Sequence, residues 1–402
     1  MALIAERLNR IKPSATMGVS GRAQELKAQG MDIISLGAGE PDFDTPDNAK
    51  EAAISAIKLG ETKYTLVPGT LALREAISAK FKRENGLDYA PSQIQVASGG
   101  KQSIYNAIMA TVEEGDEVII PAPYWVSYPD IVLLAGGTPV IVEGYAENDF
   151  KITSEQLEEA ITPKTKWLLI NSPSNPTGGI WSNESIIKLL KIAKKHNWAI
   201  ISDECYERLV YDGTFTSTEK LNQDNNIGAE VITCISLSKT YAMTGWRIGY
   251  SAGPRDIIKA MSKIQGQATS CANSIGQKAS IEALIGDQSC VEDMKRAFKE
   301  RRDLIVRLLN KIKGVTCRVP GGAFYVFPDF SYYLGMHSEE KLLKDTFDIS
   351  EYILDCAKVV TVPGDGFGSP GHIRFSYATS TQIIKKGIGK VESALKKLKS
   401  KE

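Results

Sequence analysis

Residues 236–250 read Ser-Leu-Ser-Lys-Thr-Tyr-Ala-Met-Thr-Gly-Trp-Arg-Ile-Gly-Tyr and follow the apolar run 231–235. An apolar run of this length predicts a buried strand, so Lys239 lies on the turn that leaves the sheet. Ser236, Ser238 and Arg247 flank its amine in the sequence, and two hydroxyls with a guanidinium are donors that suit a phosphate dianion. A solvated loop with an unrelated arginine is the alternative for so short a motif.

An amine beside a phosphate site indicates pyridoxal phosphate (PLP). The aldehyde of this cofactor forms a Schiff base with a lysine, and its phosphate requires neutralising groups. We therefore expect Lys239 to carry the cofactor, with Ser236, Ser238 and Arg247 near the phosphate.

The chain has 402 residues, with 48 basic and 48 acidic side chains. This length suits two domains, and the balanced charge does not indicate nucleic acid or an anionic membrane as a partner, so we expect a small molecule. The sequence has no apolar run of membrane-spanning length and its first residues lack the order of a signal peptide, which predicts a cytoplasmic protein. Its six scattered cysteines and three histidines predict neither a metal site nor a disulfide framework.

Short apolar runs recur at 94–97, 118–120, 139–142, 167–170, 199–201 and 231–235, and helical patterns at 102–112, 154–160 and 184–196 separate several of them. This alternation predicts an α/β fold with three layers, in which a mostly parallel sheet collects the ligand at the carboxyl ends of its strands. Long helical patterns from residue 274, with strand-like runs at 322–327 and 359–362, predict a smaller α+β domain. The expected division is an N-terminal arm with part of the small domain at 1–46, a large PLP-binding domain at 47–290 and the rest of the small domain at 291–402.

Polar side chains follow two of the predicted strands. Asp203 comes directly after the run 199–201, where a carboxylate is costly without a partner, and a protonated pyridine nitrogen would be such a partner. An exposed strand-end aspartate is the alternative. Tyr206 and Asn175 are expected to hydrogen-bond the phenolic oxygen of the cofactor, although the stretch 171–179 around Asn175 could also be a plain turn.

Three more stretches carry candidate ligands. Ser-Gly-Gly-Lys-Gln at 98–102 lies between a strand and a helix, so the backbone at Gly100 and Lys101 can approach a phosphate, although the stretch is not a Walker motif. Trp125 follows another strand and can cover a flat ring, with a core tryptophan as the alternative. Arg374, in a strand of alternating character at 372–378, can grip a carboxylate with two parallel hydrogen bonds, with a surface ion pair as the alternative.

The loop 36–46 contains G-x-G, but it lacks a third glycine and a clear preceding strand, so we do not expect a dinucleotide site there. In chain order, the motifs are G-x-G-E-P-D-F, G-G-K-Q, P-Y-W, N-P-T-G, D-E-x-Y, S-K-x-Y-A-M-T-G-W-R and R-x-S-Y-A. Over nearly the whole chain, this series resembles the fold-type-I aminotransferases, and within them the bacterial and plastid-like type of aspartate aminotransferase.

The resemblance implies a role for each candidate. Lys239 would be the Schiff-base lysine and proton shuttle, Asp203 would contact the pyridine nitrogen, and Tyr206 and Asn175 would contact the phenolic oxygen. The remaining implied contacts are Trp125 on the ring, then Gly100, Lys101, Ser236 and Arg247 at the phosphate, and Arg374 and Gly39 at the substrate α-carboxylate. Tyr64 matches a tyrosine that reaches the phosphate of the neighbouring subunit, which implies a homodimer with shared sites. Cys205 departs from the aliphatic residue that is usual at its position.

The expected reaction is reversible amino transfer between aspartate, glutamate and their keto acids. No arginine lies between Arg255 and Arg296, so Lys101 is the candidate for the second carboxylate of an acidic substrate, with a surface lysine as the alternative. Thr16 on the N-terminal arm could add a hydroxyl. Resembling enzymes with this Thr and Lys pair include ones that convert prephenate to arogenate, and we therefore hypothesise dual activity.

Three other functions stay open at this point. An aromatic or alanine aminotransferase, or a C–S β-lyase, would share every cofactor residue on the same fold. A non-catalytic aminotransferase-like domain of a transcription regulator would need a basic DNA-binding module, for which this chain has no residues to spare.

Overall fold

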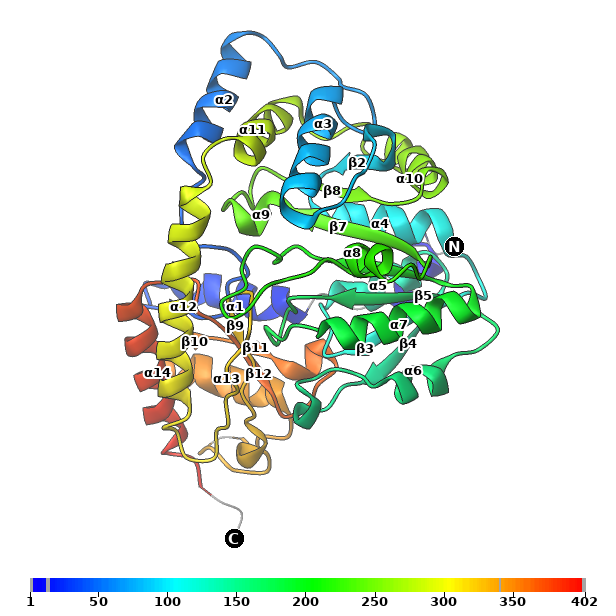
Figure 1. Cartoon of the computed structure of the whole chain (residues 1–402). Helices are drawn as coiled ribbons and strands as arrows, with labels where there is room; N and C mark the ends of the chain where they lie inside the picture. Colours follow the sequence, from blue (N-terminus) through cyan, green and yellow to red (C-terminus); the bar gives the residue numbers. More distant parts are fainter. Residues whose placement is uncertain (1–2, 12–14, 340, 400–402) are drawn as a thin grey trace.

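The computed structural model describes residues 3–11, 15–339 and 341–399, and within the first long helix it describes side chains from residue 21 onward. A large part built around a seven-stranded sheet lies beside a smaller part, and the long helix α12 (Ser289–Leu309) runs along both (Figure 1). No helix in the described residues is both long and apolar enough to cross a membrane.

The strands of the large sheet follow the order β2-β8-β7-β6-β5-β3-β4. Their bounds are β2 Ile94–Ala97, β8 Gly249–Ala252, β7 Glu230–Ser236, β6 Ala199–Asp203, β5 Thr165–Asn171, β3 Glu117–Ala122 and β4 Thr138–Glu143. All pairs are parallel except those of β8, which runs antiparallel to both β2 and β7. The six strands and the mostly parallel sheet expected from the sequence are confirmed. Strand β8 was not expected, because Gly-Tyr-Ser-Ala has no apolar run.

Alternate side chains of the central strands face two layers of helices. Trp167 and Leu169 of β5 pack on one side, beneath α4 (Gly100–Thr111), α5 (Ser127–Leu134) and α10 (Arg255–Ala268). Leu168 and Ile170 pack on the other side, beneath α6 (Ser154–Ala160), α7 (Asn183–His196) and α8 (Thr218–Asp224). Burying apolar side chains on both faces stabilises the sheet and leaves the strand ends as the place where polar groups can gather.

A separate layer of helices covers β2 and β8. It comprises α2 (Asp47–Lys58), α3 (Leu71–Lys80) and α11 (Ser274–Ile285), and their buried side chains form one cluster with those two strands. Helix α3 continues into the π-helical turn η2 (Phe81–Asn85), which ends at Gly86 with a left-handed φ of 64°.

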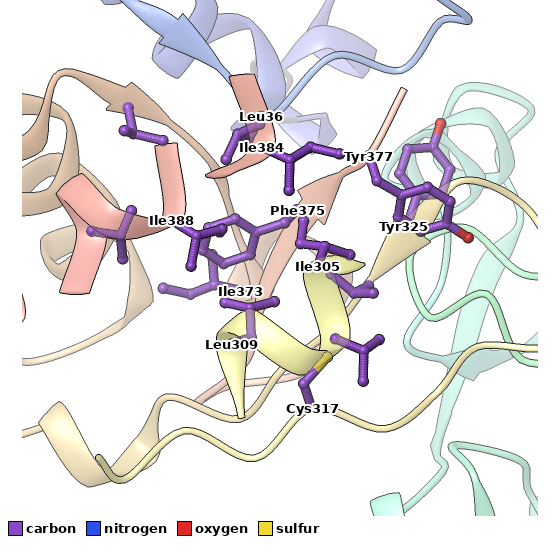
Figure 2. Close-up of a cluster of buried hydrophobic side chains, with 14 of the residues drawn as sticks. Leu36, Ile305, Leu309, Cys317, Tyr325, Ile373, Phe375, Tyr377, Ile384 and Ile388 are labelled. Carbon is purple, nitrogen blue, oxygen red and sulfur yellow. The ribbon is translucent and has the colours of Figure 1, made fainter. Parts of the chain in front are cut away.

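The smaller part has its own apolar core, drawn in Figure 2. Helices α12, α13 (Thr346–Ala357) and α14 (Thr381–Leu395) enclose the antiparallel sheet β11-β12-β9, in which β11 is Val362–Pro363, β12 is Ile373–Ser376 and β9 is Tyr325–Val326. Leu36, Ile305 and Phe375 meet in this core from three distant segments. The apolar stripe of the last helix faces it through Ile384 and Ile388.

Three details differ from the expectation. The run 359–362 forms two strands, β10 (Val359–Val360) and β11, rather than one. Strand β12 is buried at all four positions, so Arg374 does not lie in an alternating strand. Strand β1 (Ile34–Ser35) pairs with β10 and does precede the G-x-G loop. The remaining elements are η1 Glu6–Arg10, α1 Ala15–Ala28, η3 Pro91–Gln93, η4 Ala146–Asn148, α9 Leu237–Thr240, η5 Ser331–Tyr333 and η6 Gly364–Phe367.

Candidate active site

A cavity of about 660 Å³ lies where the carboxyl ends of β5, β6 and β7 face the small sheet. The strand register sets these ends side by side, because Asp203 pairs with Asn171 on β5 and with Cys234 on β7. The sequence-predicted residues that line the cavity are Gly39, Gly100, Lys101, Trp125, Asn175, Asp203, Tyr206, Ser236, Ser238, Lys239, Arg247 and Arg374. Tyr64 does not line it and is 91% exposed, and the side chain of Thr16 lies outside the described part of the chain.

Lys239 lies on the short helix α9, which begins directly after β7. Its Nζ donates a hydrogen bond of 2.5 Å to the carbonyl oxygen of Gly39. Burial lowers the pKa of Lys239, and nearby Arg374 and Arg247 lower it further against the opposite effect of Cys205. A lowered pKa favours the neutral amine, which is the nucleophilic and proton-accepting form.

Asp203 is the last residue of β6 and is 7% exposed. One carboxylate oxygen accepts a hydrogen bond of 2.7 Å from the Tyr128 hydroxyl, and the other accepts one of 3.2 Å from the Cys205 amide. Burial raises the pKa of Asp203, whereas these hydrogen bonds lower it. Because no described side chain forms an ion pair with it, a protonated ring nitrogen would fit as the missing cationic partner.

Sequence reasoning did not find Tyr128, although this residue lies only three positions after Trp125. It lies on α5 and is buried, and burial with the nearby Asp203 charge raises its pKa well above the usual range. The Tyr128 hydroxyl therefore stays protonated and donates a hydrogen bond to the Asp203 carboxylate. Its ring also meets the Trp125 ring edge to face, with centroids 5.3 Å apart. Trp125 itself is only half-buried and lines the cavity, so it is not a core tryptophan.

Tyr206 and Asn175 approach the cavity from neighbouring turns. The hydroxyls of Tyr206 and Tyr325 lie 2.9 Å apart, and burial raises the pKa of Tyr206 well above its usual range, so the phenol stays a donor. The Asn175 amide oxygen accepts from Arg374, 2.8 Å away. Among the described residues, the side-chain Nδ2 of Asn175 donates no hydrogen bond, although its backbone amide donates one to Asn171, so Nδ2 is available as a donor for a ligand.

The amino-terminal end of α4 forms a donor-rich cradle. Gly99, at φ +88°, approaches Arg247 so closely that an added Cβ would lie 2.5 Å from the guanidinium Nη2. Ser236 donates 2.8 Å to Ser238, and a Cβ on Gly100 would lie 3.2 Å from Ser236. Backbone amides at a helix start, two hydroxyls and a guanidinium are the donors that a phosphate group needs, so these residues fit the phosphate of PLP.

Arg374 occupies the middle of β12 and is 4% exposed. It donates to the carbonyl oxygen of Gly37 as well as to Asn175, each at 2.8 Å, and its guanidinium lies 4.4 Å from the Tyr325 ring centroid. Its Nε has no hydrogen-bond partner, and no carboxylate in the described residues pairs with it. A buried guanidinium without an anion is costly, so a ligand carboxylate would complete this site.

Lys101 lies in the first turn of α4, with Nζ 4.9 Å from the Trp125 ring centroid. Burial and the Arg247 charge lower the pKa of Lys101. In contrast to Asp203 and Arg374, its side chain remains exposed at the cavity rim. A long flexible cation in this place can meet an anion from the open side of the cavity.

Comparison with known proteins gives the class of this protein. The family model of the class I and II aminotransferases matches residues 31–391, so the chain belongs to that family and is an enzyme. It is 50% identical to an aspartate/prephenate aminotransferase of Cereibacter sphaeroides, over 98% of each chain. It is 47% identical to one of Nitrosomonas europaea, over 98% of this chain and 99% of the relative.

Two solved structures of similar fold are aspartate aminotransferases. The enzyme from Rhizobium meliloti gives a TM-score of 0.95 at 45% identity, with 99% of this chain and all 100% of that chain covered. The Thermus thermophilus enzyme with maleate gives a TM-score of 0.91 at 41% identity, with 98% and 100% covered. The fold-type-I architecture expected from the sequence is therefore confirmed.

Proposed function

We propose that this chain is a PLP-dependent aspartate:2-oxoglutarate aminotransferase that also transfers the amino group of glutamate or aspartate to prephenate, which yields arogenate. The observation that carries the proposal is the buried, anion-free guanidinium of Arg374 in the same cavity as Lys239. The printed names of the relatives support the choice of aspartate and prephenate.

The residues of the cavity would hold PLP by its three polar regions. Gly100, Lys101, Ser236, Ser238 and Arg247 would surround the phosphate, Asp203 the ring nitrogen, and Asn175 and Tyr206 the phenolic oxygen. Trp125 would cover the ring. When bound, PLP supplies an electron sink for the negative charge that develops at the substrate α-carbon.

The chain's own residues divide the remaining work. Arg374 binds the α-carboxylate, and the carbonyl of Gly39 holds the amine of Lys239 in the same cavity. Lys239, whose pKa is lowered by burial, would accept a proton from the substrate α-carbon at its Nζ. Asp203 would balance a protonated ring nitrogen, and the hydrogen bond from Tyr128 orients the Asp203 carboxylate.

The second carboxylate of aspartate or prephenate would bind Lys101, with Thr16 adding a hydroxyl when the N-terminal arm covers the site. The similar Thermus thermophilus enzyme was solved with maleate, and maleate is a dicarboxylate. A flexible lysine at an open rim tolerates acids of different size better than a rigid arginine fork would.

We further propose a homodimer of two-domain subunits, with boundaries near residues 46 and 290. Tyr64 would reach the phosphate in the partner subunit. Exposed apolar side chains precede and follow it in the sequence, on α2, α3 and the loop between them, namely Ile54, Ile57, Leu59, Leu66 and Leu71. Surface of this kind commonly marks a protein–protein contact.

The test is a set of assays on purified protein loaded with PLP. Aspartate with 2-oxoglutarate should yield oxaloacetate and glutamate, and prephenate with glutamate or aspartate should yield arogenate. Turnover of oxaloacetate without prephenate would reject the dual activity. Release of pyruvate and ammonia from amino acids, with no amino transfer, would instead indicate a β-lyase.

A further inference from the structure

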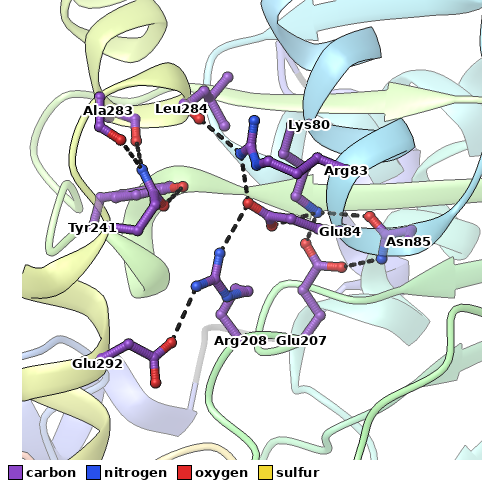
Figure 3. Close-up of polar contacts among 12 residues, drawn as sticks. Lys80, Arg83, Glu84, Asn85, Glu207, Arg208, Tyr241, Ala283, Leu284 and Glu292 are labelled. Atoms are coloured by element: carbon purple, nitrogen blue, oxygen red, sulfur yellow. Dashed lines mark hydrogen bonds and ion pairs between the residues drawn. The ribbon is translucent and has the colours of Figure 1, made fainter.

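Figure 3 shows a buried ionic cluster that includes Glu207, the residue after Tyr206, and whose charged residues do not line the cavity. Its centre is Lys80, the last residue of α3, which is 2% exposed and forms an ion pair with the 7% exposed Glu207. Asn85 bridges the two, since it accepts 2.9 Å from Lys80 and donates 2.8 Å to the other oxygen of Glu207. Both carboxylate oxygens of Glu207 are therefore held by one helix end.

The turn 203–208 divides its side chains between the cavity and the interior. Asp203, Cys205 and Tyr206 line the cavity, whereas Glu207 and Arg208 point into the cluster. Arg208 pairs with Glu84 at 2.9 Å and with Glu292, at the start of α12, at 3.2 Å. Since Glu207 is bonded directly to Tyr206 in the chain, a fixed Glu207 leaves little freedom to the ring of Tyr206.

Hydrogen bonds also connect the region of the cluster to the chain segment that carries Lys239. Tyr241, two residues beyond this lysine, donates 2.9 Å to Gln288, and Gln288 lies just before α12. Arg83 of η2 donates 2.9 Å to the carbonyl of Leu284 and pairs with Glu84 at 2.6 Å. One packed unit thus supports both chain segments that deliver reactive groups to the cavity.

A contribution to folding stability does not by itself explain the buried Lys80–Glu207 ion pair. Two buried charges pay a large desolvation cost, and well-packed apolar residues in their place are often as stable or more so. What the pair can provide instead is a fixed geometry. The two carboxylate oxygens of Glu207, held by the Lys80 ammonium and the Asn85 amide, favour a single arrangement of the backbone. Glu207 takes part in the central ion pair of the cluster and is also the residue next to Tyr206 in the chain.

We propose that the Lys80–Glu207 pair, bridged by Asn85, is a positioning device that fixes the turn 203–208 and so aims the Tyr206 hydroxyl at the cofactor ring. This inference rests on the proposed function. Lys80, Asn85 and Glu207 touch no substrate, and they act through the backbone of Tyr206.

The first measurement uses cofactor-free protein and follows hydrogen exchange at three amides that close the turn. These are the amides of Glu204, Glu207 and Leu209, which bond to Cys234, Glu204 and Tyr206. Lys80→Met and Glu207→Gln should speed their exchange by about tenfold, because the turn opens locally without global unfolding. Arg302→Met is the matched control, since it removes a buried cation of α12 that pairs with Asp212 away from the cavity.

The second measurement uses PLP-loaded protein and follows its visible absorbance against pH. Lys80→Met and Glu207→Gln should each raise the pH midpoint of the absorbance change by about one pH unit. Tyr206→Phe should do the same, since a misplaced or missing Tyr206 hydroxyl no longer favours the ionised phenolic oxygen of the cofactor. Arg302→Met should keep the wild-type midpoint. Lys80→Arg should keep much of it as well, because the positive charge is retained.

The double variant Lys80→Met/Glu207→Leu separates the effect on the placement of Tyr206 from the effect on thermal stability. It should recover much of the thermal stability lost by Lys80→Met, because no unpaired charge remains buried, yet it should keep the shifted midpoint. Variants that melt earlier but retain wild-type exchange and midpoint would overturn the positioning role. A wild-type protein without any visible band would instead contradict the proposed cofactor, so the two failures can be told apart.

Discussion

The two ends of the cavity are built differently. At the cofactor end, Asp203 and Ser236 are buried at the last residues of β6 and β7, and the pleated register holds them in place. At the rim, Lys101 and the α1 residues Gln24 and Lys27 line the cavity with exposed side chains. The buried polar groups Asp203 and Ser236 thus lie at strand ends, whereas the exposed polar groups at the rim lie on helices. The choice of substrate can change at the rim without disturbing the sheet.

The largest effect is expected at the cofactor end, from Lys239→Ala. Turnover should fall by about 10⁴-fold or more, because the variant loses both the covalent attachment and the proton transfer. Steady-state amino transfer and the visible absorbance of PLP-loaded protein measure the two losses. The exposed Lys259→Ala is the control and should behave as wild type. If Lys239→Ala retained the visible absorbance band and normal turnover, Lys239 would not be the residue that binds PLP and transfers the proton.

Asp203→Asn should cost about 3 kcal/mol of transition-state stabilisation, or roughly a hundredfold in kcat/KM, because an uncharged amide cannot balance a protonated ring. PLP should still bind. Asp203→Glu should lose less, since the charge remains and only the geometry changes. Normal turnover by Asp203→Asn would mean that the buried carboxylate has only a structural role.

At the rim, Lys101→Ala should raise KM about tenfold for aspartate, oxaloacetate and prephenate, because one charge-assisted hydrogen bond to the far carboxylate is lost. Alanine and aromatic amino acids should be affected much less. Lys101→Arg keeps the charge and should restore part of the preference. Equal changes for acidic and neutral substrates would assign Lys101 to the phosphate alone and would weaken the contrast between the two ends.

The smallest effect is expected from Tyr64→Phe, which removes one hydroxyl from a 91% exposed side chain. PLP should dissociate about fivefold more readily, with no change in thermal stability, if this hydroxyl reaches the partner's phosphate. The matched control is Tyr145→Phe, another exposed tyrosine. Dilution of wild-type protein should cost activity as dimers separate, and a fully active monomer would refute the shared site.

Local patterns in the sequence predicted most of what is local in the structure. Apolar runs located six strands of the large sheet, and polar residues directly after them located Asp203 and Lys239 at its carboxyl edge. The roles of these residues stay predictions, as do the domain boundaries, the dimer and a cytoplasmic location. Strand β8 was missed because a sheet partner on each side, rather than its own composition, makes Gly-Tyr-Ser-Ala a strand.

Contacts between distant segments could not be predicted in the same way. The hydroxyl of Tyr128 meets Asp203 across 75 positions of the chain, and Lys80 meets Glu207 across 127. No periodicity links such residues, because their distance depends on how whole elements pack. A lysine within the amphipathic pattern of α3 is indistinguishable in the sequence from a solvated one, whereas the fold buries it.

The antiparallel pairing of β7 and β8 bears on the order in which the site assembles as the chain folds. Ser236 and Gly249 are register partners, so the segment 237–248, with Lys239 and Arg247, leaves and rejoins the sheet at one point. Closing so short a loop costs little chain entropy, whereas the contact of Arg374 with Asn175 joins positions 199 apart. We therefore expect Lys239 and Arg247 to come together early, as one hairpin, and Arg374 to arrive only after long-range docking.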